Sequence, residues 1–134
     1  MNNKELIRTF FERAFVKHDL DAAAQFISED YRLHGPMRTD SSRGPGAFKE
    51  GHGLYLGAMR EHAAAIDDQI AEGDKVVTRW TASGCQIKDL PGIPDKGKCF
   101  KIGGITIDRV SDGKIAEEWV NWDTADFARQ LGAD

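Results

Sequence analysis

Apolar residues recur in the first third of the chain at the three- to four-residue spacing that gives a helix one hydrophobic face. This spacing predicts helices over residues 3–17, 20–28 and 46–62. Asn2 and Glu5 stand three positions apart at the start of the first helix, where they can act as a capping pair. Asp19 is placed to cap the second helix.

From residue 66 onward the pattern changes to the alternation and β-branched composition of strands. We predict a curved antiparallel sheet over residues 66–123, with a brief extended stretch at 31–33 and a loop over 37–45. Asp112-Gly113 suits a type I′ hairpin turn, and Thr124 is expected to cap a short last helix. Helices followed by an antiparallel meander make this an α+β chain.

The bulk properties of the sequence exclude several classes of protein. A chain of 134 residues fits one hydrophobic core, so we expect a single domain over residues 1–134. The formal net charge of −4 argues against a nucleic-acid-binding surface, which needs clustered Lys and Arg. Charged residues interrupt the N-terminal apolar stretch, so we expect neither a signal peptide nor a membrane partner, and a cytoplasmic location.

Cysteine and histidine do not form a metal-binding pattern. Cys85 and Cys99 are too few for a disulfide framework or a zinc site, and we interpret them as small strand residues. His18, His52 and His62 lack metal-ligand spacing, so surface or core positions are expected for them. We therefore expect no metal and no cofactor.

One face of the last predicted strand is unusually polar for a core. With a two-residue loop at residues 112–113, Val110 pairs with Ile115, and Asp108 pairs with Glu117 and shares its face. A face that mixes tryptophan with an amide and carboxylates is typical of a pocket wall. By alternation, the strand residues on this face are Ile115, Glu117, Trp119, Asn121 and Asp123.

Asp123 and His34 are the candidate catalytic residues. A carboxylate beside tryptophans is partly desolvated, which raises its pKa and makes it a better base. Asp123 could instead be a charge or cap at the start of the last helix, and His34 could either polarise a substrate carbonyl or tie down its loop.

The remaining candidates are assigned to substrate binding. Asn121 could hydrogen-bond an enolate oxygen or satisfy nearby backbone. Glu117 and Asp108 could share a proton or form ion pairs with arginines. Tyr55 is expected on the inner side of its helix, and Trp119 on the pocket wall.

Four segments of the second half, IAEGDKVVTRW, GIPDKGK, IDRVSDGKIAEEW and WDTADFARQLG, resemble in order and spacing the SnoaL-like polyketide cyclase family. The resemblance extends from about Asp30 to Gly132. It implies the nuclear transport factor two-like cone, in which N-terminal helices and a curved sheet enclose a pocket. Many relatives have Thr-His where this chain has Cys85-Gln86.

The resemblance also implies a reaction. In SnoaL-type cyclases an aspartate just past the last strand is the acid/base catalyst of an intramolecular aldol ring closure, and Asp123 matches it, four residues after Trp119. His34 matches a histidine of the family. We therefore expect a cofactor-independent polyketide or ester cyclase (a lyase or isomerase) that removes a proton α to the carbonyl of a small hydrophobic compound.

Other activities of the same fold stay open. They are a ketosteroid isomerase-like enzyme, a limonene epoxide hydrolase-like enzyme, and a ligand-binding or oligomerisation module without catalysis. We also expect a homodimer, because Ile105, Ile107 and Val120 are predicted on the outer face of the sheet.

Overall fold

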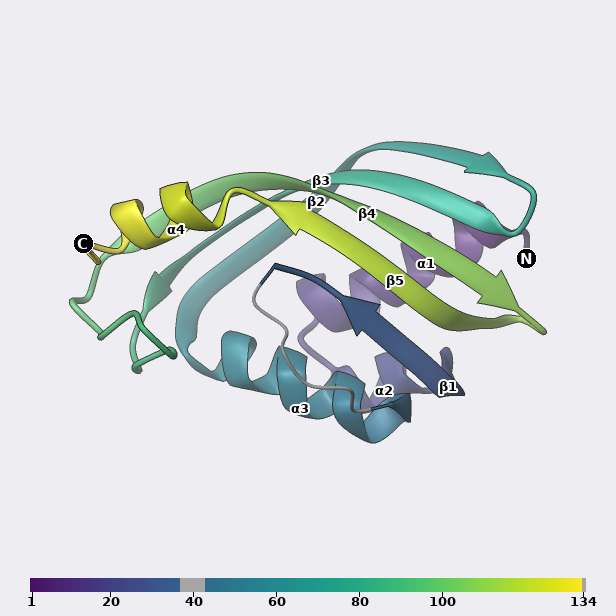
Figure 1. The fold of residues 1–134 in the computed structure, drawn as a ribbon, viewed down its shortest axis with the longest axis horizontal. Coiled ribbons are helices and arrows are strands. Elements are labelled where there is room, and N and C mark those ends of the chain that lie inside the picture. Colours follow the sequence, from purple (N-terminus) through teal and green to yellow (C-terminus); the bar gives the residue numbers. More distant parts are fainter. Residues whose placement is uncertain (37–42, 134) are drawn as a thin grey trace.

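The structure is a computed structural model and describes residues 1–36 and 43–133. Within these residues the α+β prediction is confirmed, and the strands form one curved sheet in the order β1-β5-β4-β3-β2. In Figure 1 this sheet arches over the helices from the first half of the chain, and the last helix lies at one end of the strands. The strands are β1 (Ile27–His34), β2 (Met59–Glu72), β3 (Lys75–Gln86), β4 (Cys99–Ser111) and β5 (Lys114–Trp122).

The helices lie at the start, the middle and the end of the chain. They are α1 (Asn3–Phe11), which continues into the π-helical turn η1 (Glu12–Val16), then α2 (Leu20–Ala24), α3 (Gly44–Gly57) and α4 (Thr124–Gln130). None of the helices in the described part of the chain is long and apolar enough to cross a membrane.

The predicted caps of the first two helices are confirmed, whereas Asp123 and not Thr124 caps α4, because the helix already includes Thr124. The Glu5 N–H donates a 2.8 Å hydrogen bond to the Asn2 side chain, and the Glu5 carboxylate accepts one from the Asn2 N–H. The Ala22 N–H donates a 3.0 Å hydrogen bond to Asp19 at the start of α2. Local chemistry therefore fixes where these two helices begin.

Two helices are shorter than predicted, because the residues expected at their C-terminal ends lie in or beside paired strands. The helix predicted over 20–28 ends at Ala24, since Ile27 already pairs with Ile115 of β5. The helix predicted over 46–62 ends at Gly57, since Met59 pairs with Gln86 of β3. Sheet pairing thus outweighs the helix propensity of the last residues of both predicted helices.

The sheet confirms the predicted antiparallel pairing from β2 to β5 and adds one parallel strand. At the β4–β5 turn, Val110 pairs with Ile115, and Asp112 and Gly113 have φ values of 51° and 73°, as a type I′ turn requires. The stretch predicted at 31–33 is the longer edge strand β1, which pairs with β5 in parallel. The expectation of a purely antiparallel sheet is wrong here, because no turn links β1 to β5 and constrains its direction. Most of the loop predicted over 37–45 lies outside the described residues.

The hydrophobic core consists of two clusters at different places along the sheet. One includes Phe10, Phe48 and Ile115 and joins α1 and α3 to the ends of β4 and β5 nearest their turn. The other includes Phe100 and Phe127 and packs α4 against the opposite ends of the strands.

Cys85 and Cys99 are joined by a disulfide between β3 and β4. This corrects the interpretation of these two residues as unlinked small strand residues. They are directly opposite each other in the antiparallel pair, so the sheet register brings their sulfur atoms within bonding reach.

Candidate active site

Side chains from α1, α3 and the sheet line a cavity of about 670 Å³. This volume lies in the range of sites that enclose a drug-sized small molecule. Both core clusters contribute to the lining, so the cavity occupies the space where they meet. Its wall is rich in aromatic rings, among them Phe10, Phe15, Trp80, Trp122 and Phe127.

Two carboxyl groups interrupt this apolar wall. Asp108 of β4 and Glu118 of β5 are directly opposite each other, and both line the cavity. Only 2% of Asp108 and 5% of Glu118 is exposed. The hydroxyl of Tyr31, a buried residue of β1, donates a 2.6 Å hydrogen bond to Glu118 Oε1. Residues of three neighbouring strands therefore form the carboxyl pair and the hydrogen bond from Tyr31 that supports it.

The pKa of Asp108 is raised well above its ordinary value. Burial is the largest cause, and the charge of Glu118 and a hydrogen bond with that carboxyl act in the same direction. The pair therefore retains a proton at pH values where an exposed aspartate has lost it. Within the described residues, Asp108 Oδ1 has no hydrogen-bond partner, so this atom can accept or share a bond with a bound ligand.

A bulge decides which face of β5 meets the cavity. Val110 lies opposite Ile115 as predicted, but Arg109 lies opposite Glu117, so Ala116 is an extra residue in β5. One extra residue moves every later side chain of the strand to the other face. The predicted pairing of Asp108 with Glu117 is therefore wrong.

The cavity side of β5 consists of Glu118, Val120 and Trp122. The predicted face, with Glu117, Trp119 and Asn121, points away from the cavity. Val120, which was expected on the outer face of the sheet, lies on the inner one.

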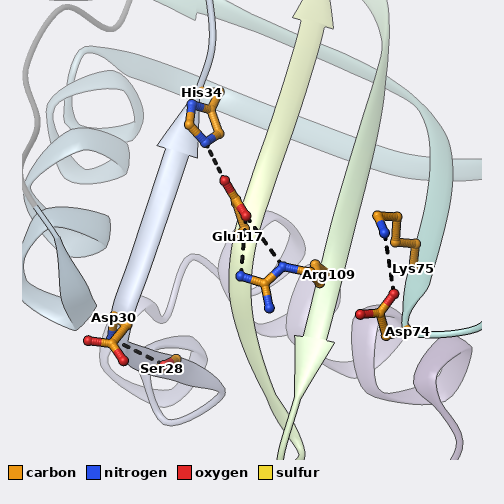
Figure 2. A network of polar contacts seen from close by, with 7 residues as sticks. All are labelled: Ser28, Asp30, His34, Asp74, Lys75, Arg109 and Glu117. Atoms are coloured by element: carbon orange, nitrogen blue, oxygen red, sulfur yellow. Dashed lines mark hydrogen bonds and ion pairs between the residues drawn. The ribbon is translucent and has the colours of Figure 1, made fainter.

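Three of the candidates, His34, Glu117 and Trp119, lie together in a polar cluster on the outer face of the sheet. Figure 2 shows His34 of β1, Glu117 of β5 and Arg109 of β4 joined across neighbouring strands. His34 Nε2 lies 2.6 Å from Glu117 Oε2, and Arg109 Nη2 donates a 3.2 Å hydrogen bond to Glu117 Oε1. The Trp119 ring stacks on His34 with 5.5 Å between ring centroids. The sequence placed Glu117 and Trp119 on one face and left an ion pair between Glu117 and an arginine open, but the expected place of His34, Glu117 and Trp119 in the pocket is wrong.

Glu117 is held as a carboxylate in this cluster. Partial burial alone would raise its pKa, but hydrogen bonds and charges from His34 and Arg109 outweigh burial and lower the pKa. A carboxylate stabilised in this way is a weak base.

Asp123 occupies the capping position that the sequence left as the alternative to catalysis. Its carboxylate accepts a 2.9 Å hydrogen bond from the Asp126 N–H at the start of α4. The residue is exposed and does not line the cavity. Asp123 thus lies outside the set of residues that line the cavity, which includes Asp108 and the neighbouring Trp122.

Tyr55 lines the cavity from α3, together with two histidines that were expected in surface or core roles, His52 and His62. The Tyr55 hydroxyl lies 2.8 Å from His62 Nε2. Burial raises the pKa of Tyr55. Burial and, next, the neighbouring His18 lower the pKa of His62 to about 4.

Sequence reasoning missed Glu118, Tyr31 and the two cavity histidines. The pair Glu117-Glu118 presents one carboxylate to each face of the strand, and nothing in the sequence marks Ala116 as the bulge that selects between them. Among residues 1–36 and 43–133, no group of three or more His, Cys, Asp or Glu side chains is arranged to hold a metal ion.

Comparison with known proteins places the chain in a family. The model of the SnoaL-like polyketide cyclase family matches residues 5–131. TsrD from Streptomyces laurentii is 28% identical, with a TM-score of 0.87 over 100% of this chain and 99% of its own. IdmH from Streptomyces antibioticus shares the fold at 24% identity, with a TM-score of 0.79 over 99% of this chain and 100% of its own. A SnoaL-like protein from Jannaschia sp. CCS1 also shares the fold, at 17% identity and with a TM-score of 0.88 over 98% of this chain and 92% of its own. No curated protein matches the sequence. The chain therefore belongs to the SnoaL-like polyketide cyclase family.

Proposed function

We propose that this protein is a cofactor-independent cyclase in which the Asp108–Glu118 pair performs acid/base catalysis on a small hydrophobic carbonyl compound. One observation carries the proposal: two buried carboxyl groups lie directly opposite each other in the wall of a large apolar cavity. Membership of the family supports ring closure as the outcome.

The pair supplies both halves of an enolisation. The Glu118 carboxylate accepts the proton from the carbon α to the substrate carbonyl, while neutral Asp108 donates a hydrogen bond to the carbonyl oxygen. The enolate carbon then attacks a second carbonyl carbon of the same molecule, which forms the new C–C bond. The proton held on Glu118 passes to the resulting alkoxide, so the carboxylate is regenerated.

The surroundings favour this chemistry. The aromatic wall keeps water from the carboxyl groups, and a charge that develops in such a site is stabilised strongly by fixed hydrogen-bond donors. The hydrogen bond from Tyr31 to Glu118 fixes the orientation of that carboxylate. A ketosteroid-type isomerase would use the same first step, so an assay of that step addresses both outcomes.

The test is deuterium incorporation from D₂O into the α position of 2-tetralone, followed by NMR. Asp108→Asn and Glu118→Gln keep the shape of each side chain and remove its acid/base function, so each is expected to slow exchange by about 10²–10⁴-fold. Asp123→Asn is the matched control and should retain the wild-type rate. If Asp123→Asn abolishes exchange and Asp108→Asn does not, the pair is not the catalyst and Asp123 is.

We further propose that the outer face of the sheet forms a homodimer interface. Ile105, which is 48% exposed, and Ile107 lie on this face beside the Arg109–Glu117 ion pair. An apolar surface with paired charges of both signs suits a two-fold contact with a second copy. Light scattering should report a dimer for the wild type and a monomer for Ile105→Glu. A monomeric wild type at micromolar concentration would refute the interface.

A further inference from the structure

We propose that Tyr55, His62 and His18 form a proton-conducting chain that connects the cavity to solvent. The Tyr55 hydroxyl lies 2.8 Å from His62 Nε2, and His62 Nδ1 lies 3.2 Å from His18 Nε2. Tyr55 and His62 line the cavity, whereas His18 is exposed on the surface. The three side chains therefore make a continuous hydrogen-bonded path across the cavity wall. This path does not include the Asp108–Glu118 pair and goes beyond the function proposed above.

The backbone adopts unfavourable conformations at His18 and at Glu61, the residue before His62. Three non-glycine residues in the described part of the chain have positive φ: His18 (57°), Glu61 (54°) and Asp112 (51°). The hairpin turn accounts for Asp112. His18 is itself in the chain, and Glu61 immediately precedes His62. Such conformations cost free energy and persist only where the surrounding structure imposes them, often at functional sites.

The strained residues lie in irregular segments that place the two imidazoles together. His18 follows the π-helical turn η1, and π-helical turns recur at functional sites. His62 lies in a bulge of β2, where Arg60 pairs with Cys85 and Ala63 with Ser83. As a result the two rings meet edge to face, with 5.2 Å between their centroids.

Neutral imidazole is the chemical form that such a chain needs. It has one donor and one acceptor nitrogen, so His62 can take a proton at Nε2 and release another from Nδ1. Burial and His18 lower the pKa of His62 to about 4, although a hydrogen bond with the Phe15 backbone acts in the opposite direction, so His62 is neutral near pH 7 and does not trap the proton. The ionisable residues adjacent in sequence are Lys17 and Asp19 beside His18, and the Arg60–Glu61 ion pair before His62.

Each transfer along the chain balances. A ligand group gives its proton to the Tyr55 oxygen as Tyr55 passes its own hydroxyl proton to His62 Nε2. His62 then passes its Nδ1 proton to His18 Nε2, and His18 releases its Nδ1 proton to water. The reverse sequence delivers a proton to the cavity and restores the first tautomer of His62.

Bound 2-naphthol offers a direct test, because its hydroxyl becomes strongly acidic on excitation and its ionised form emits at a longer wavelength. The probe bound to wild-type protein, excited at a wavelength longer than those that tryptophan absorbs, should show naphtholate emission. In Tyr55→Phe and in His18→Asn the ratio of naphtholate to naphthol emission should fall by about tenfold or more, since the acceptor path is cut. Asparagine suits position 18 because it tolerates positive φ.

Two further variants separate this proposal from the proposed function. His34→Asn is the matched control, since it makes the same change at a histidine outside the cavity, and its emission should equal that of the wild type. If bound probe shows no naphtholate emission, or if only Asp108→Asn and Glu118→Gln abolish it, the proposed chain is refuted. Retained naphtholate emission in those two carboxyl variants supports the chain whether or not the pair is catalytic.

A measurement without ligand tests the contact itself. In long-range ¹H–¹⁵N spectra, wild-type His62 should remain neutral down to about its pKa of 4. His18→Asn should raise that pKa, because it removes a charge that opposes protonation of His62. A His62 titration identical in wild type and His18→Asn would refute the chain, even if the naphthol probe fails to bind.

Discussion

The buried carboxyl pair makes a quantitative prediction about stability and pH. In the unfolded chain Asp108 loses its proton near its ordinary pKa of 3.8, whereas in the folded protein that pKa is raised well above this value. Between the two pKa values the folded state binds one more proton than the unfolded state. The contribution of Asp108 to the free energy of unfolding therefore falls as pH rises through this window, by about 1.4 kcal/mol per pH unit.

Asp108→Asn removes this titration and keeps the shape of the side chain. The difference in unfolding free energy, variant minus wild type, should therefore increase by about 1.4 kcal/mol for each pH unit above about 4, until the raised pKa is reached. His62 contributes a slope of opposite sign between about 4 and 6.5, because its pKa is lowered on folding. That contribution is common to both proteins and cancels in the difference.

Urea unfolding followed by tryptophan fluorescence measures this difference at half-unit steps from pH 4.5 to 7.5. Asp112→Asn in the exposed hairpin turn is the control for removal of one carboxylate, and asparagine also tolerates its positive φ. Glu118→Gln should narrow the pH window in which this difference increases, since the charge of Glu118 is one cause of the raised pKa of Asp108. If Asp108→Asn and wild type give parallel curves, the raised pKa of Asp108 is refuted.

Three further predictions concern single contacts. Asp123→Ala should lower the free energy of unfolding by about 1 kcal/mol and Asp123→Asn by much less, as measured by urea titration, because asparagine also caps helices; equal losses would argue against capping. Reduction of Cys85–Cys99, whose separation is 14 residues, should destabilise the protein by up to about 3 kcal/mol, seen as a lower Tm with dithiothreitol; the double serine variant should show no response. Gly104→Ala should displace Trp80, since a Cβ there would meet the indole ring; an unchanged near-UV circular dichroism spectrum would contradict this.

The sequence was sufficient for features that depend on neighbouring residues. The Asn2–Glu5 capping box and the Asp112-Gly113 turn follow from local chemistry, and the structure has both. The order of helices and antiparallel strands also follows from local periodicity. The parallel strand β1 does not, because its pairing with β5 joins segments that no turn connects.

The position of the candidate site depended on a one-residue bulge that the pattern of polar and apolar residues does not reveal. Alternation along β5 was a sound principle, but one extra residue at Ala116 reverses it for the rest of the strand. The sequence therefore placed Glu117 and Trp119 correctly on one face of β5 but assigned that face to the wrong side of the sheet, and it did not predict their contacts with His34. Asp108 was assigned to the correct face because it lies in β4, which has no extra residue. The alternation of side chains from Val110 to Asp108 is therefore unbroken.

The polar groups of the cavity are carried by separable parts of the chain. Asp108 and Glu118 belong to one hairpin, while Tyr55 and His62 come from α3 and the start of β2. The loop between β3 and β4 adds Leu90 and Pro91 to the wall. Segment exchange with relatives could therefore replace the loop, or the α3–β2 unit, and leave the carboxyl pair intact. For protein engineering, exchange of the loop alone would change the cavity wall and keep the carboxyl pair, whereas exchange of the α3–β2 unit would also replace Tyr55 and His62.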